Sequence, residues 1–171
     1  MNATINLENK HFPVLLNELI SIISPLYGGT FIDCTFGQGG YSKKILENKE
    51  NNIIAIDRDK DVLMSASKFE KKYRRRFKFY NIKFSQLKKI KIKNNDLKGI
   101  IFDLGYSFNQ IKNSKKGLSF NDKGKLNMRM GINDFSANDF ISNMDENNLS
   151  RVFKIFGDEK YSKKIAREIV K

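Results

Sequence analysis

The chain has 171 residues, 40% of them hydrophobic, which is enough for one ordinary domain with a buried core. Lys and Arg number 32 against 19 Asp and Glu, so the formal net charge is +13 and the chain should attract phosphate backbones or anionic surfaces. One cysteine and one histidine exclude an internal disulfide and a His/Cys zinc site. No stretch approaches the roughly 18 apolar residues of a membrane span. The first residues, MNATINLENKHF, lack a signal-peptide pattern, so we expect a soluble cytoplasmic protein with no membrane partner.

The first two thirds of the chain alternate between helix-like and strand-like segments. Apolar residues at helical spacing predict a first helix over residues 13–26, with Pro13 in its first turn. Short apolar runs predict strands over residues 30–34, 52–57, 77–82 and 99–104, and helices are expected from about Ser42, over residues 62–73 and over residues 86–90. Strands that alternate with helices predict an α/β fold with a parallel sheet and right-handed crossovers.

The last third of the chain differs in composition. Residues 106–136 are rich in Gly, Ser, Asn and Lys and are predicted to form a loop, whereas residues 136–171 should be helical apart from Gly157. We therefore expect one domain over residues 1–110 and a second region over residues 111–171.

A glycine-rich turn follows the first predicted strand. It reads Asp33-x-x-x-Gly37-x-Gly39-Gly40, and Asp57 ends the next strand. Ligands of open α/β sheets lie beyond the carboxyl ends of the strands, where an acid suits a pair of ribose hydroxyls. The spacing is G-x-G-G and not G-x-G-x-x-G, and the Asp33 carboxylate suits an ammonium group better than a pyrophosphate. The pattern thus favours S-adenosylmethionine over a nicotinamide cofactor.

A third acid, Asp103, closes the fourth predicted strand and should face the same crevice. Methyl transfer requires an electron pair placed in line with the methyl carbon, and a carboxylate that accepts a proton of an exocyclic base amine would help to localise that pair. We therefore expect Asp103 to be catalytic, although an acid here can also serve only to cap the following turn. Cys34, inside the first strand and with no histidine near it in sequence, is interpreted as a packing residue and not as a nucleophile.

Many further motifs of the chain resemble one family, the bacterial 16S ribosomal RNA cytosine-N4 methyltransferases (RsmH or MraW). The resemblance covers His11 to Val170. Its motifs are, in chain order, His11-x-Pro13-Val14-Leu15-Leu16-x-Glu18, Asp33-x-Thr35-x-Gly37-x-Gly39-Gly40, Ile56-Asp57-Arg58-Asp59, Phe84-Ser85-x-Leu87, Asp103-Leu104-Gly105-x-Ser107-x-x-Gln110, Gly117-x-Ser119-Phe120, Met128-Arg129-Met130, Gly157-x-Glu159-Lys160-Tyr161-Ser162 and Ile165-Ala166-Arg167.

The resemblance implies a Rossmann-like methyltransferase fold into which a helical substrate domain is inserted. It implies N4 methylation of a cytidine in the decoding centre of 16S rRNA, in the small ribosomal subunit, with S-adenosylmethionine as the cofactor. The family's cofactor residues correspond to Gly39, Gly40, Tyr41, Asp57, Phe84, Asp103 and Gln110 of this chain. Phe84 would cover the adenine ring, although an aromatic residue after a strand is as often part of a core.

The chain departs from the family pattern at several positions. Tyr41 replaces a usual His, Phe108 and Asn109 replace Ser and Pro, and Asn127 replaces an Asp, a change expected to weaken a contact to Arg129 or to substrate. The family also continues beyond the end of this sequence, so we expect an incomplete sheet of about four strands and little activity from these residues alone. A second polypeptide that completes the fold, and a homodimer, are both left open.

Two basic segments are candidates for RNA contact. Residues 71–78, KKYRRRFK, are interpreted as the solvated end of a helix, and residues 112–125 are the better candidate because they lie close to Asp103 in sequence. Two alternatives to the enzyme remain at this stage, namely a non-catalytic RNA-binding remnant of it and a nucleotide-binding oxidoreductase.

Overall fold

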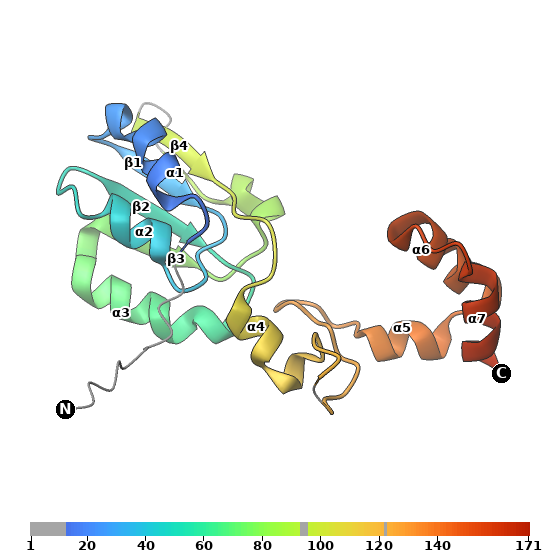
Figure 1. Cartoon of the computed structure of the whole chain (residues 1–171). Coiled ribbons are helices and arrows are strands. Elements are labelled where there is room, and N and C mark those ends of the chain that lie inside the picture. The colour runs from blue at the N-terminus through green and yellow to red at the C-terminus, as the bar shows by residue number, and fades with distance from the viewer. Residues whose placement is uncertain (1–12, 93–95, 122) are drawn as a thin grey trace, which may run out of the picture. The chain divides into compact units, whose positions relative to one another are not determined.

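The computed structural model describes residues 13–92, 96–121 and 123–171 and divides into two compact units, one ending at Phe108 and the other beginning at Asn109. The first unit contains a four-stranded sheet, shown in Figure 1. Its strands are β1 (Thr30–Asp33), β2 (Asn52–Ile56), β3 (Phe77–Tyr80) and β4 (Leu97–Ile101). Their order is β3-β2-β1-β4, and every pair is parallel, as the alternation of strands and helices predicts.

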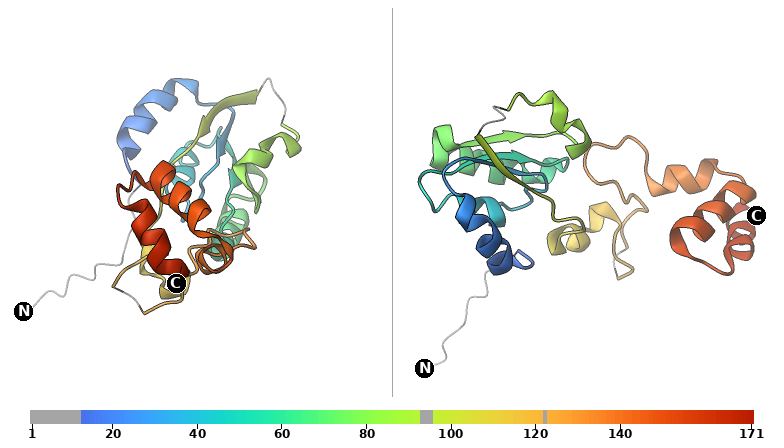
Figure 2. Two further views of the ribbon diagram at one scale, coloured as in Figure 1. Left: turned by 90° about the vertical axis from the view of Figure 1, so that its right-hand side faces the viewer. Right: turned by 90° about the horizontal axis from the view of Figure 1, so that it is seen from above.

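The register of the sheet aligns the carboxyl ends of the strands. Asp33, the last residue of β1, pairs with Ala55 of β2 and with Ile101 of β4, and Ile56 of β2 pairs with Tyr80 of β3. The two views of Figure 2 show the strands running side by side through this unit. The segments that follow the four strands therefore leave the sheet at one common edge.

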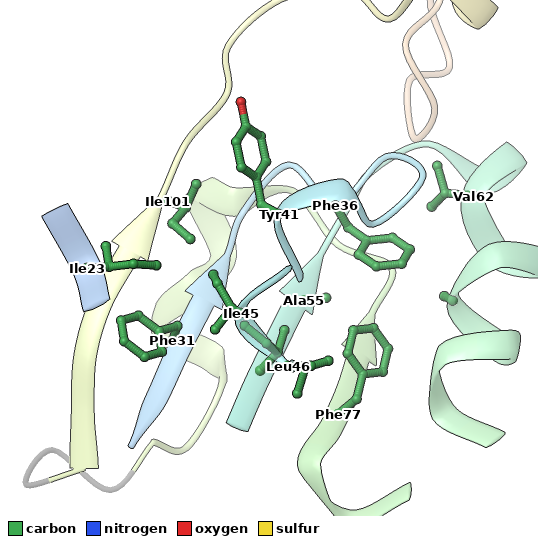
Figure 3. Close-up of a cluster of buried hydrophobic side chains, with 12 residues drawn as sticks. Ile23, Phe31, Phe36, Tyr41, Ile45, Leu46, Ala55, Val62, Phe77 and Ile101 are labelled. Carbon is green, nitrogen blue, oxygen red and sulfur yellow. The ribbon is translucent and has the colours of Figure 1, made fainter. Parts of the chain in front are cut away.

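Three helices cover one face of the sheet and supply most of the core. They are α1 (Leu16–Ile23), α2 (Gly40–Ile45) and α3 (Leu63–Tyr73). Figure 3 shows the centre of this core, where Phe31 of β1 and Ile45 of α2 are completely buried. Short 3-10 turns join these elements: η1 (Ser24–Leu26), η2 (Lys60–Val62) and η3 (Arg74–Arg76).

The opposite face of the sheet is covered more thinly. Ile32, Cys34 and Ile56 are buried there beside Ile90, which follows the 3-10 segment η4 (Phe84–Lys89). At β4 this cover ends, and the side chain of Ile100 is 43% exposed.

Several predicted boundaries in the first unit differ: β3 ends at Tyr80 and not at Ile82, β4 begins at Leu97 and not at Gly99, and the segment predicted as a helix over residues 86–90 is the 3-10 segment η4. Two further differences have local reasons. The first helix begins at Leu16 and not at Pro13, because Leu15 has a left-handed backbone with φ of 52° that no regular helix can include. β4 ends at Ile101 and not at Leu104, because the amide of Asp103 donates to the Thr35 hydroxyl at 2.8 Å and leaves the strand ladder. Asp103 thus lies two residues beyond its strand.

The second unit is helical, and short helices interrupt the segment that was predicted to be a loop. They are α4 (Phe108–Lys112) and η6 (Ser114–Lys116), followed by α5 (Ala137–Asn143), α6 (Glu146–Gly157) and α7 (Ser162–Val170). Side-chain oxygens of Ser136 and Asp145 accept backbone amides at the starts of α5 and α6, so the predicted helical tail is three separate helices. α6 packs on α7 through Leu149 and Ala166, both fully buried.

In the parts of the chain that the structure describes, no helix is both long enough and apolar enough to cross a membrane.

Candidate functional site

The carboxyl edge of the sheet brings together residues singled out after the first, second and fourth strands. The amide of Gly37, in the turn after β1, donates to a carboxylate oxygen of Asp57 after β2, over 2.8 Å. This bond ties two neighbouring strand ends into one structure, as the sequence predicts from the parallel order of the strands.

The glycine turn has the backbone that its composition predicts. Gly37 and Gly39 have φ values of 53° and 79°, a left-handed conformation that glycine adopts without strain. A Cβ atom on Gly39 would lie 2.5 Å from the Phe69 ring and 2.7 Å from the Phe36 ring, and one on Gly40 would collide with Pro13. A side chain at either position would displace packed rings, so both glycines are required by the packing beneath the turn as well as by any ligand above it.

Asp57 is only partly buried, and both of its carboxylate oxygens accept backbone amides. One accepts from Gly37 and the other from Asp59, each over 2.8 Å. Burial raises the pKa of the Asp57 carboxyl, and these two donors oppose the rise. The backbone amide of Arg58 is a third donor to this carboxylate, which has about four acceptor positions, so room is left for a hydroxyl donor.

Asp33 does not have the exposure that a direct ammonium contact would need. Its side chain is completely buried, the Ser42 hydroxyl donates to one oxygen at 2.7 Å, and the Thr35 amide donates to the other at 3.3 Å. Burial is the largest cause that raises the pKa of Asp33, to about 6. Asp33 therefore stabilises the glycine turn from below, and the direct contact to a cofactor ammonium that the sequence suggested is not available in this structure.

Asp103 lies at the same edge and is held from two sides. Its backbone amide donates to the Thr35 hydroxyl, and its carboxylate lies 3.2 Å from the hydroxyl oxygen of Tyr41. The Tyr41 hydroxyl also lies 2.5 Å from the Val14 carbonyl oxygen. Burial, and next to it the charge of Asp103, raise the pKa of Tyr41 to about 12, so the phenol keeps its proton and remains a donor at neutral pH.

An aromatic pair occupies the outer part of this edge. Phe84, which follows β3, and Phe102, which follows β4, meet edge to face with ring centroids 5.5 Å apart. Their side chains are 43% and 49% exposed, so neither ring is part of the core. The arrangement offers an apolar surface suited to a flat aromatic ligand.

Sequence reasoning missed three residues of this edge. Phe102 was read only as part of the fourth strand, although it lies one residue before Asp103. Thr35 was named only as a member of a family motif and Ser42 only as the start of a helix, so the bonds by which they hold Asp103 and Asp33 were not inferred. Their roles depend on which strand ends become neighbours, and only the fold shows that.

Three further residues were singled out in the sequence, namely Cys34, Gln110 and Asn127. Cys34 is buried, and burial raises the pKa of its thiol to about 11, which confirms that it is a packing residue. Gln110 belongs to α4 in the second unit. The contact between residues 127 and 129 is present, since the side-chain oxygen of Asn127 accepts from Arg129 Nε at 2.7 Å; whether it is weaker than the ion pair that an Asp would make stays a prediction. An amide oxygen replaces a carboxylate oxygen in this bond.

The basic segment 71–78 is not a uniform cationic surface. The guanidinium of Arg76 donates to the carbonyl oxygens of Leu46, Asn48 and Asn51 at 3.3, 2.9 and 3.2 Å. Arg76 therefore closes the loop after α2, while Lys71 and Lys72 are exposed at the end of α3. This agrees with its interpretation as a helix end.

The strand order and the acids and glycines at the strand ends define a Rossmann-like methyltransferase fold. The sequence model of the MraW methylase family matches residues 8–171, and the chain belongs to that family.

Curated relatives carry the name ribosomal RNA small subunit methyltransferase H. The relative from Orientia tsutsugamushi (strain Ikeda) is 40% identical over 164 residues, which are 96% of this chain and 53% of the relative. The relative from Rickettsia bellii is 38% identical over the same shares, and that from Zymomonas mobilis is 40% identical over 94% of this chain and 49% of its own length. The chain thus spans about half the length of the curated relatives that it matches.

Proposed function

We propose that the carboxyl edge of the sheet binds S-adenosylmethionine. The observation that carries this proposal is the bond between Gly37 and Asp57, which joins a glycine turn to an acid at the adjoining strand end. Asp57 would accept the ribose hydroxyls, Gly39 and Gly40 would let the cofactor approach the backbone, and Phe84 with Phe102 would cover the adenine ring. Asp33 would support the turn from below, and Tyr41 would act through its contact with Asp103.

The reaction that we propose is methylation of a nucleobase at an exocyclic amine, the N4 amine of a cytidine in the decoding centre. The cofactor supplies an electrophilic methyl group on a sulfonium. The carboxylate of Asp103 would accept a hydrogen bond from the amine, hold its nitrogen toward the methyl group and take up the proton as it leaves. Asp103 suits this role because Thr35 and Tyr41 hold it from two sides at the cofactor edge.

The substrate that we propose is 16S ribosomal RNA within the small ribosomal subunit, in the cytoplasm. Relatives with 38–40% identity are named as ribosomal RNA small subunit methyltransferases, and the net charge of +13 suits a polyanionic partner. Residues 1–110 would form the methyltransferase domain. Gln110, at the end of that domain, would be a further cofactor residue, and residues 111–171 would contribute the active-site loop and part of the substrate domain. A homodimer and a second polypeptide remain alternatives for completing the assembly.

A thermal-shift titration tests the cofactor directly. S-adenosylmethionine and S-adenosylhomocysteine should each raise the melting temperature of the chain in a concentration-dependent way, and NAD should not. Stabilisation by NAD alone would favour an oxidoreductase. If none of the three stabilises the chain while it still binds RNA, a non-catalytic RNA-binding role would replace the proposed enzyme.

A further inference from the structure

The second unit presents one aromatic ring entirely to solvent. Phe120 has a relative exposure of 108%, the largest among the exposed apolar side chains of the described residues. Phe120 and Asn121 lie in a turn, and the segment 118–121 is here called the Phe120 turn; in it the Asn121 amide donates to the Ser119 hydroxyl at 3.2 Å. No part of the cofactor site described above includes it.

Hydrogen bonds cross the base of the Phe120 turn. The Met128 amide donates to the Lys116 carbonyl at 2.7 Å, and the Asn127 side-chain amide donates to the Lys115 carbonyl at 3.1 Å. A Cβ atom on Gly117 would collide with the Lys125 carbonyl oxygen, so two backbone segments run in direct contact beneath the turn. The backbone that carries the exposed Phe120 ring is therefore fixed at its base by hydrogen bonds and by close backbone packing.

The surroundings of the ring are strongly cationic. Residues 109–131 contain six Lys and Arg and one acid. Lys115 and Lys125, whose backbones form the base of the turn, are exposed, and so are Lys123 and Arg129 further along the segment. An exposed ring among exposed cations is typical of surfaces that bind single-stranded nucleic acid, where bases stack on the ring and phosphates lie against the cations.

We propose that the Phe120 turn binds unpaired RNA, with Phe120 stacked on a nucleobase and Lys115 and Lys125 against the flanking phosphates. The inference rests on the proposed action on RNA and names the contact that would hold the strand. Ser119 and Asn121 flank the ring with polar groups, and the exposed Leu126 and Met128 near the base of the turn lie in a segment that also carries Lys125 and Arg129, so the cations favour a nucleic acid over an apolar partner.

The test is RNA binding by the 171-residue chain, measured without any cofactor by fluorescence anisotropy of a labelled single-stranded oligoribonucleotide. Phe120→Ala should weaken binding about 5- to 150-fold, the range for loss of one stacked base, and leave the salt dependence unchanged. Lys115→Gln with Lys125→Gln should instead make the salt dependence shallower. Phe156→Ala, which removes a ring of α6 that is 84% exposed, is the matched control and should leave binding unchanged.

A tryptophan at this position gives an independent readout, because the chain has no other tryptophan. Phe120→Trp should restore affinity, emit as a solvent-exposed indole in the free chain and change in intensity when RNA is added. Wild-type affinity in Phe120→Ala, indole emission that ignores RNA, a buried indole in the free chain or preference for anionic vesicles would each overturn the proposal. Cofactor binding is measured separately by thermal shift, so failure here is distinct from failure of the proposed enzyme.

Discussion

The hydroxyl of Tyr41 lies 3.2 Å from a carboxylate oxygen of Asp103, although 62 residues separate them in the chain. The contact exists because α2 begins directly after the glycine turn of β1, and β4 pairs with β1. Tyr41 is 7% exposed and replaces the His of the family pattern, so a neutral phenol donor now faces the acid that we propose to be catalytic. Substitution of either residue should therefore change the ionisation or the position of the other.

The ionisation of Tyr41 reports this contact. Asp103→Asn removes the negative charge, and the pKa of Tyr41 should fall from about 12 part of the way toward its ordinary value near 10, because burial, the larger cause, remains. The measurement is alkaline titration of tyrosinate absorbance, with Tyr41→Phe spectra subtracted to isolate one of the six tyrosines. An unchanged titration in Asp103→Asn would show that the two side chains do not interact in solution.

Asp57 should be required for cofactor affinity. Asp57→Ala should weaken binding of S-adenosylmethionine by about 1–3 kcal/mol, the range for hydrogen bonds to a charged group. Isothermal calorimetry measures the change, and Asp57→Asn, which keeps one acceptor oxygen, should lose less. Because Asp57 also accepts the amides of Gly37 and Asp59, urea unfolding of both variants checks that the turn persists. Equal affinity in all three proteins would remove Asp57 from the site.

Asp103 should matter more for transfer than for binding. Asp103→Asn keeps the shape and an acceptor oxygen but removes the charge that would take up the amine proton. In a protein completed with the C-terminal part of a relative, single-turnover transfer of a tritiated methyl group to small ribosomal subunits should slow by about 10²-fold or more, while affinity for S-adenosylmethionine changes much less. Equal losses in both measurements would make Asp103 a binding residue only.

The buried carboxyl of Asp33 should make stability depend on pH. Its pKa is raised to about 6 from 3.8, so its contribution to stability is present at low pH and is lost as the pH rises through about 6. Relative to Asp33→Asn, the wild type should therefore lose about 3 kcal/mol between roughly pH 4 and pH 7. Urea unfolding across that range measures the difference. Ser42→Ala, which removes a donor to the carboxylate, should move the loss to higher pH; a pH-independent difference would contradict the burial of a charge at Asp33.

Gly39 should tolerate no side chain. Gly39→Ala places a Cβ atom 2.5 Å from the Phe69 ring on a left-handed backbone, and should lower the free energy of unfolding by about 2–4 kcal/mol. Gly157→Ala is the matched control, because no atom lies within 4 Å of its Cβ position, and its stability should change little. Equal stability of the two variants, measured by urea unfolding, would show that the glycine turn is looser than its packing indicates.

The sequence alone predicted the four strands, their parallel direction and the places of two of the three acids, Asp33 and Asp57, at the carboxyl ends of β1 and β2. Asp33 and Asp57 lie where short apolar runs end, because hydrophobic patterning is a local signal. The bond between Thr35 and the Asp103 amide was not predictable, since it joins residues that meet only after β4 pairs with β1. The end of β4 and the edge-to-face contact of Phe84 with Phe102 depend on the same long-range pairing.

Pro13 fills the space in which a side chain at position 40 would have to lie. The two positions are therefore expected to vary together in evolution: a lineage that keeps the proline ring should keep glycine at 40. Only one that shrinks residue 13 gains the freedom to place alanine or serine there. In a randomised library, substitutions of Gly40 should survive selection for folding only when residue 13 is randomised too. The residue found at position 13, before α1, would then indicate which residues position 40 of the turn can accept.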